Sequence, residues 1–308
     1  MFVRQVLNRQ YQFKTLDIAL KNQITEQCQC FVSELNHRLP KESQLDLSLQ
    51  IPKKVPYYHK HVLMLTPKAG DWKKWPSKIE LAISFPFNLV GPLKSSLKNT
   101  NTGSSILVNE LDLPGFHSSE KEIKFLVIPD MKIYTVDPSQ LPQFSTFLGE
   151  GNLASSSHKL SFADYLQGSD KVNPESQEGE NPGSDINLAS QFKTQDFHHD
   201  LILVCGHYNR DARCGELAPL LIDKLNSIRP TLKTGIVSHV GGHKFAGNII
   251  YYQFNGVNNK NKNNTCDVEG LWFSKVLPQN LETVLENLDQ NIILQDFYRG
   301  HISYTGYK

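Results

Sequence analysis

The sequence has few cysteines, no long hydrophobic run and almost no net charge, and each shortage argues against a class of protein. An odd, low number of cysteines in 308 residues does not indicate a secreted scaffold held by disulfides. No stretch approaches the roughly 20 apolar residues that span a bilayer, so we do not expect a membrane span. A formal net charge of +1 gives no sign of a nucleic-acid-binding protein. The five cysteines are Cys28, Cys30, Cys205, Cys214 and Cys266.

The N-terminus also lacks acidic residues, and this is typical of a mitochondrial targeting segment. Arg4, Arg9 and Lys14 precede the first acidic residue, Asp17, and apolar side chains lie between them. We therefore predict a presequence over residues 1–15 and a mitochondrial location, the matrix rather than the intermembrane space. The alternative is a frayed terminus without a targeting role, because Lys14 falls among the apolar positions.

The N-terminal half has the order of elements of an α/β domain. Helical spacing of apolar residues between 16 and 39 puts Cys28 and Cys30 about 200° apart, so they cannot chelate one metal. We expect Cys28 in the core and Cys30 as a free surface thiol. We predict a thioredoxin-like domain over residues 16–167 without a recognisable active site. Its further elements are strands at 60–65 and 105–108, a helical stretch at 79–97, a hairpin at 125–136 and a helix at 138–148.

The C-terminal half repeats this plan after a polar segment. Residues 168–194 are rich in Ser, Asn, Gly, Pro and Glu, which predicts a flexible linker. A second thioredoxin-like domain is predicted over 195–308. Its elements are strands at 201–204 and 234–237, helices at 216–225 and 279–288, and a hairpin of 248–252 with 270–273.

Two cysteines and two histidines follow strands of this second domain. Cys205 ends a buried strand, and Cys214 lies at a helix start, where the helix dipole stabilises a thiolate. His239 and His243 follow the next strand, and the Gly-Gly between them favours a tight loop over a helical metal motif. The four side chains suit one metal centre. The residue types alone leave structural zinc, an iron–sulfur cluster and a site without metal as alternatives.

Three runs of sequence decide among these alternatives by resemblance. Residues 203–208, 210–216 and 238–248, the last reading H-x-G-G-H-x-F-A-G-N, closely resemble the sucrase/ferredoxin-like family. Shorter matching runs at 60–65, 125–134, 159–166, 271–276 and 298–303 extend the resemblance over most of the chain. The resemblance implies a thioredoxin-like ferredoxin whose [2Fe–2S] cluster has Cys205, Cys214, His239 and His243 as ligands. No paired carboxylates support glycoside hydrolysis, despite the family name.

The predicted function is therefore electron transfer by a mitochondrial [2Fe–2S] protein, a carrier rather than a substrate-converting enzyme. Its redox donor and acceptor are unknown proteins. The alternatives are a structural zinc protein and a thiol-based redox protein using Cys28, Cys30 or Cys266, although a C-x-x-C motif is absent. Four charged or polar residues of the loop before Cys214 either support the centre or form a solvated loop: His207, Arg210, Asp211 and Arg213. Arg299 matches the family without a role that the sequence explains.

Overall fold

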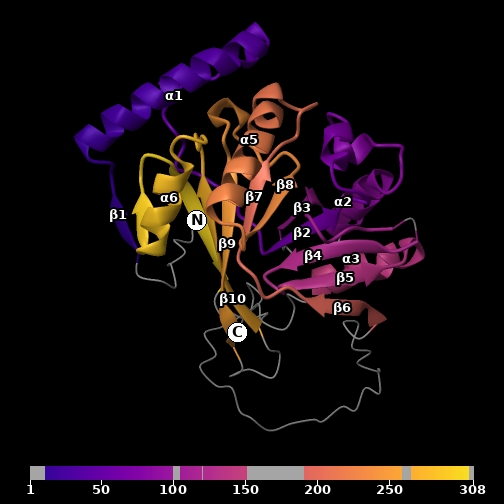
Figure 1. Cartoon of the computed structure of the whole chain (residues 1–308). Coiled ribbons are helices and arrows are strands. Elements are labelled where there is room, and N and C mark those ends of the chain that lie inside the picture. Colours follow the sequence, from indigo (N-terminus) through magenta and orange to yellow (C-terminus); the bar gives the residue numbers. More distant parts are fainter. Residues whose placement is uncertain (1–10, 100–104, 120, 151–190, 259–264, 305–308) are drawn as a thin grey trace, which may run out of the picture.

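The computed structural model describes residues 11–99, 105–119, 121–150, 191–258 and 265–304 as one mixed α/β structure (Figure 1). Its main sheet has ten strands in the order β12-β10-β9-β7-β8-β3-β2-β4-β5-β6. The helices are α1 (Ile18–Arg38), α2 (Val90–Asn99), α3 (Leu141–Glu150), α5 (Ala212–Ile228) and α6 (Leu281–Asp289). The first-half strands are β1 (Gln12–Lys14), β2 (Lys60–Leu65), β3 (Ile106–Asp112), β4 (Ile123–Ile128) and β5 (Lys132–Val136). The second-half strands are β6 (Lys193–Asp196), β7 (Leu201–Cys205), β8 (Lys233–Val237), β9 (Ile249–Asn258), β10 (Thr265–Phe273), β11 (Ile292–Leu294) and β12 (Tyr298–Tyr304).

The two halves have the same strand arrangement. In the first, β2 pairs parallel with β3 and antiparallel with β4, and β4 forms a hairpin with β5. In the second, β7 pairs parallel with β8 and antiparallel with β9, and β9 forms a hairpin with β10. Both β2 and β7 are buried along their whole length, as expected for strands covered on both faces.

The halves join through strands β3 and β8 of the same sheet. These strands pair antiparallel, with Leu111 opposite Val237 and Asp112 opposite Ile236. The sheet therefore continues from one half into the other. This confirms the α/β class, whereas the division into two thioredoxin-like domains stays a prediction.

Segments of each half also extend the other half. Strand β1 pairs parallel with β11, and α1 (indigo in Figure 1) contacts the residue before α6, because Cys28 Sγ accepts a hydrogen bond from Asn280 at 3.7 Å. Asp296 accepts hydrogen bonds from the Leu16 backbone N–H at 2.8 Å and from the Lys21 ammonium at 2.9 Å. In the opposite direction, β6 adds an edge strand to β5. Folding therefore ties the two halves together by reciprocal contacts.

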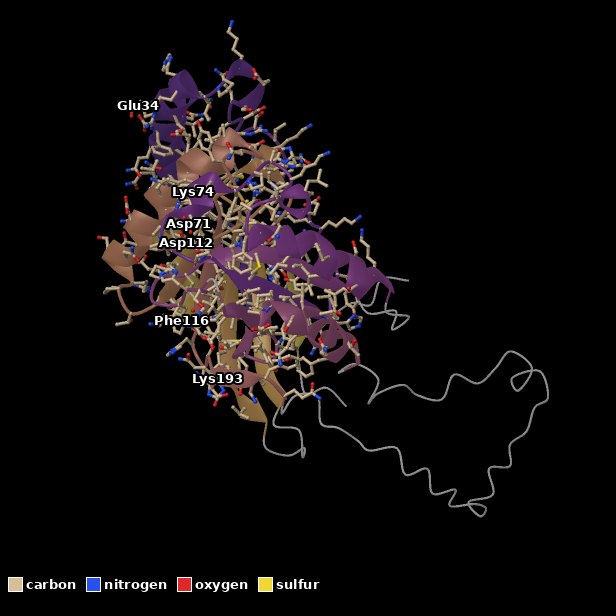
Figure 2. The ribbon with its side chains drawn as sticks, turned by 90° about the vertical axis from the view of Figure 1, so that its right-hand side faces the viewer. Glu34, Asp71, Lys74, Asp112, Phe116 and Lys193 are labelled. Atoms are coloured by element: carbon tan, nitrogen blue, oxygen red, sulfur yellow. The ribbon has the colours of Figure 1, made fainter. Side chains whose placement is uncertain are left out.

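The segment between β2 and α2 folds over the end of the sheet. Figure 2 shows Asp71, Lys74 and Asp112 close together at this place. Asp112 accepts a hydrogen bond from the Gly70 backbone N–H at 2.6 Å, and Lys74 pairs with Asp71 at 2.8 Å. Trp75, which is fully buried, follows directly. This anchored segment reaches the loop that follows β7.

Most of the predicted elements are confirmed in type, and most of these are longer than predicted. The stretch at 79–97 differs, because it consists of two short 3-10 turns at Ile79–Leu81 and Phe87–Leu89 followed by α2. The predicted helix at 216–225 begins at Ala212, and the predicted strand at 105–108 continues to Asp112. Most of the predicted linker lies outside the described residues, but its last residues from Lys193 belong to β6. Residues 1–10 of the predicted presequence also lie outside them, whereas Gln12–Lys14 forms β1. Within the described residues, no helix has the length and apolar character needed to cross a membrane.

Candidate metal centre

Cys205 and Cys214 lie together beneath the surface. Cys205 is the last residue of β7, and Cys214 is in the first turn of α5. The two thiols are 2% and 0% exposed, and a hydrogen bond joins them. Donation from Cys214, and then from the His239 side chain, holds the pKa of Cys205 well below its usual value. The neighbouring Cys205 sulfur and burial raise the pKa of Cys214 well above its usual value.

The Gly-Gly loop brings the two histidines together, as the sequence predicts. Gly241 and Gly242 have φ angles of 88° and 77°, a left-handed conformation that side chains disfavour. The His239 and His243 rings have their centroids 5.3 Å apart and are tilted by 40°. Nδ1 of each ring is buried without a hydrogen-bond partner. Buried polar atoms are rarely left without a partner, so these two nitrogens are free to accept a metal.

Asp211 and Arg213 form a buried ion pair rather than a solvated loop. Both Oδ atoms of Asp211 accept from the Arg213 guanidinium, at 2.9 and 2.8 Å. Burial raises the pKa of Asp211, but the hydrogen bonds and charge of Arg213 outweigh this and leave it below its ordinary value. Asp211 also caps α5 by accepting from the Arg213 backbone N–H, and one of its oxygens lies 4.0 Å from His243 Nε2. The pair therefore fixes the helix start that carries Cys214.

His207 supports the backbone of the histidine loop. It is 3% exposed, its Nε2 lies 2.9 Å from the Pro76 carbonyl oxygen, and its Nδ1 accepts from the His239 backbone N–H at 3.3 Å. A carbonyl oxygen only accepts, so the proton is on Nε2. Burial lowers the pKa of His207, which keeps the ring neutral in this arrangement.

A chain of buried polar groups reaches the same loop from the N-terminal half. Asn109 on β3 donates to the Ser238 hydroxyl at 2.9 Å and to the His239 carbonyl at 3.1 Å. His61 on β2 contacts Asn109 Oδ1 at 3.0 Å and the Tyr252 hydroxyl at 2.7 Å. None of these supporting residues was predicted from the sequence. A signal was present in β2, where His61 is a polar residue next to an apolar run, whereas Asn109 lies among other polar residues of β3.

Arg299 holds the histidine loop from the opposite side, which accounts for the residue that the sequence left unexplained. It is 6% exposed on β12, and its Nη1 donates to the Gly241 carbonyl at 3.3 Å and to Asn248 Oδ1 at 3.2 Å. Its guanidinium stacks over Trp272 at 5.6 Å. A Cβ at Gly242 would come 2.7 Å from Nη1. Position 242 therefore has no room for a larger side chain while Arg299 keeps its place.

The other three cysteines lie elsewhere and are free thiols. As predicted, Cys28 is buried and Cys30 is exposed. Burial raises the pKa of both Cys28 and Cys266 to about 11, so these thiols stay protonated at neutral pH and are weak nucleophiles. Among the described side chains, no three of His, Cys, Asp and Glu are placed to hold a single metal ion. The four predicted ligands instead form two neighbouring pairs.

Comparisons with known proteins agree with the resemblance. The family model described as sucrase/ferredoxin-like matches residues 51–300. The chain is similar to "altered inheritance of mitochondria protein 32" of Kluyveromyces lactis, with 56% identity over 100% of this chain and 94% of the relative. The protein of that name from Eremothecium gossypii is 38% identical over 95% and 94%. That from Saccharomyces cerevisiae (strain S288c) is 37% identical over 90% and 89%. No solved structure gives a significant match.

Proposed function

Because the chain belongs to the sucrase/ferredoxin-like family, we propose that it is an electron carrier whose [2Fe–2S] cluster is bound by Cys205, Cys214, His239 and His243. One observation carries the proposal: a hydrogen-bonded thiol pair lies beside a histidine pair whose buried Nδ1 atoms have no partner. When bound, such a cluster takes up and releases one electron.

The donor set fits this cofactor in its chemistry. Thiolates bind iron, and hydrogen bonds from Cys214 and His239 lower the pKa of Cys205, which favours its thiolate. Neutral imidazoles are suited to iron, and burial lowers the pKa of His243. Ligation in two pairs serves the two irons of a binuclear cluster, whereas tetrahedral zinc needs four donors around one point.

The surrounding residues orient the proposed ligands. His207 and Asn109 fix the backbone of His239, and Arg299 fixes the Gly241 carbonyl between the two histidines. Partners of this kind orient the ligands of metal sites and tune the bound metal. The Arg299 guanidinium also places a positive charge near Cys205, which favours a thiolate there. These contacts support a role for His207 and Arg299 in positioning the proposed ligands.

Two further expectations belong to this proposal. We infer that each half is a thioredoxin-like domain, supported by the shared strand order and helix positions. We also infer a mitochondrial location, the matrix rather than the intermembrane space. The basic N-terminus supports the mitochondrial part of this inference, as does the reference to mitochondria in the names of the relatives.

The test is analysis of the protein purified without oxygen. We expect visible charge-transfer absorption with two irons and two acid-labile sulfides per chain. Mössbauer spectra should separate a thiolate-ligated iron from an imidazole-ligated iron. A colourless protein that contains one zinc per chain would contradict the proposal and indicate a structural zinc site.

A further inference from the structure

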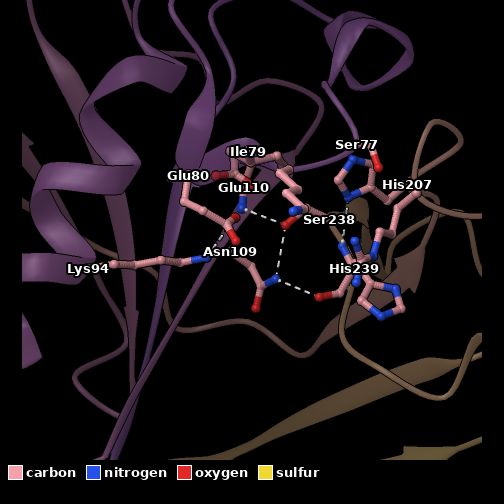
Figure 3. Close-up of a pocket in the computed structure, with 11 residues that line it drawn as sticks. Ser77, Ile79, Glu80, Lys94, Asn109, Glu110, His207, Ser238 and His239 are labelled. Atoms are coloured by element: carbon pink, nitrogen blue, oxygen red, sulfur yellow. Dashed lines mark hydrogen bonds and ion pairs between the residues drawn. The ribbon is translucent and has the colours of Figure 1, made fainter.

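A second site is suggested by a cavity where the two halves meet. The cavity has a volume of about 230 Å³, and Figure 3 shows the residues that line it. The N-terminal half contributes residues 77–80, Lys94 of α2 and Glu110 of β3. The C-terminal half contributes Arg210 and His239, among others. Because both halves supply walls, the cavity exists only in the complete fold.

The inner wall carries a buried carboxylate without an ion-pair partner among the described residues, and the Ser238 hydroxyl and the charge of Lys94 stabilise its ionised form only in part. Glu110 is 1% exposed, and neither of its side-chain oxygens accepts a hydrogen bond of ordinary geometry. Burial, the largest effect on this group, raises its pKa to about 7. Leaving a buried carboxylate unpaired is costly, and a ligand that donates hydrogen bonds would remove this cost. A cationic group that donates hydrogen bonds would therefore stabilise Glu110 best.

The opposite wall carries a surplus of positive charge. Lys94 Nζ lies 3.9 Å from Glu80 Oε2. The pKa of Glu80 is lowered, first by a hydrogen bond from its own backbone and then by the charges of Lys94, Arg210 and Lys78. Lys78, Lys94 and Arg210 face two carboxylates, Glu80 and Glu110, so one positive charge is left available for an anionic group.

We propose that this cavity binds a small zwitterion with the head group of an α-amino acid, its ammonium on Glu110 and its carboxylate on Lys94 and Arg210. A purely anionic ligand would leave Glu110 unpaired, and a simple amine would face the positive wall. The volume lies below the roughly 300–1,000 Å³ of sites for drug-sized ligands, which suits a molecule of amino-acid size.

The binding test uses the full-length protein and the twenty L-amino acids together with L-ornithine. Saturation-transfer NMR identifies binders, and calorimetry measures their affinity. We expect at least one saturable binder, and its N-acetyl and carboxamide derivatives should each bind at least ~10-fold more weakly, because each lacks one of the two charges.

Two variants and two matched controls assign the binder to the cavity. Glu110→Gln and Lys94→Met should each weaken binding by ~10-fold or more, the loss of one charge-assisted contact. Glu122→Gln and Lys98→Met change exposed residues outside the cavity lining and should bind like the unmodified protein.

The proposal is overturned if none of these amino acids binds, or if the binder is retained by Lys94→Met. That second variant decides the question even if Glu110→Gln fails to fold, because Lys94 lies partly exposed on a helix. The proposed site does not require the cluster. A colourless protein would therefore contradict the electron-transfer proposal and leave this one standing.

Discussion

The N-terminal and C-terminal halves share one strand arrangement but differ in the residues at the ends of their central strands. Strand β7 ends in Cys205 and leads to His207, whereas β2 ends in Leu65 and leads to Thr66 and Pro67. Likewise, β8 leads to Ser238 and His239. The same framework therefore carries a candidate metal centre in one half and none in the described residues of the other. A few residues at strand ends decide the chemistry, as in other open α/β sheets.

The half without ligands still contributes to the site. Its Asn109 holds the His239 carbonyl, and its Pro76 carbonyl holds the His207 ring. The C-terminal half thus contains the proposed ligands, and the N-terminal half helps to position them. These two roles can be tested by substitutions in either half.

The largest effect should follow from removing a ligand in the C-terminal half. Cys205→Ser or Cys214→Ser should abolish the visible absorption of the purified protein, because each variant removes a thiolate that we propose as an iron ligand. Cys266→Ser is the matched control, since Cys266 is also buried but lies against Asp130 rather than the centre. Iron and sulfide analysis provides the measurement. Full cluster content in Cys205→Ser would show that the ligands are assigned wrongly.

The second prediction concerns the pH dependence of stability contributed by Glu110 of the N-terminal half. Burial raises its pKa from an ordinary 4.5 to about 7 in the folded protein. The folded state therefore binds this proton more tightly, and its contribution to stability is full below pH 4.5 and is lost as the pH rises through 7. The loss is up to roughly 3 kcal/mol, at about 1.4 kcal/mol per pKa unit.

Urea unfolding of the unmodified protein and Glu110→Gln between pH 5 and 8 measures this effect. The variant should have the flatter dependence, and Glu122→Gln should keep the original one. Parallel curves for the unmodified protein and Glu110→Gln would exclude a raised pKa at this position.

The third prediction tests whether the N-terminal half positions a ligand. Asn109→Leu removes the hydrogen bonds to the Ser238 hydroxyl and the His239 carbonyl. It should reduce the free energy of unfolding by about 1–3 kcal/mol, the usual cost of leaving buried polar groups unpaired. Bound iron should also be lost faster to a chelator. Ser145→Ala, in the same half but bonded to Pro142, should not accelerate iron loss. Equal rates of iron loss in both variants would show that Asn109 does not stabilise the metal centre.

The fourth prediction concerns the reduction potential. Two neutral imidazoles in place of two thiolates remove negative charge, so the potential should lie above the roughly −400 mV of plant-type ferredoxins. Reduction makes a ligating histidine hold its proton more tightly, so the potential should fall by about 59 mV per pH unit above the pKa of the oxidised state.

Voltammetry across neutral to alkaline pH tests this dependence. His239→Cys or His243→Cys should lower the potential and flatten the curve, whereas His117→Cys in the N-terminal half should change neither. A flat curve in the unmodified protein would argue against histidine ligation.

The smallest effect on stability is expected at the N-terminus. Because Gln12–Lys14 pairs with β11, we expect the cleavage that removes a targeting segment to occur before Tyr11. Deletion of residues 2–10 should prevent import into mitochondria and leave the thermal midpoint unchanged. Deletion of 2–15 should also lower the midpoint, because β1 is lost. N-terminal sequencing of the protein from isolated mitochondria locates the cleavage, and a start after Lys14 would contradict the prediction.

The main elements could be predicted from the sequence because apolar periodicity is strong in buried strands and helices. Strands β6 and β1 were missed for a physical reason: all their residues are exposed, so edge pairing leaves no hydrophobic signal. The β3–β8 pairing was also missed. It joins residues more than a hundred positions apart and depends on the whole fold rather than on either strand.

The four proposed ligands were found from residue type and spacing, and their supporting residues were found only in part. His207 and Asp211 lie within the Cys205–Cys214 loop, so local sequence pointed to them. Asn109 and Arg299 reach the site from distant strands. Their partners are distant in the sequence and include backbone carbonyls, so the sequence pattern does not show which site these residues reach.

The reciprocal contacts between the halves should hold them together even when the backbone between them is cut. The segment before residue 150 supplies β1 and α1 to the second half, and the segment after residue 191 supplies β6 to the first. The β3–β8 pair adds a further junction of backbone hydrogen bonds. A chain cut once between residues 150 and 191 should therefore persist as a two-fragment complex. Separately produced fragments should complement each other, since each offers the other an edge strand that it lacks.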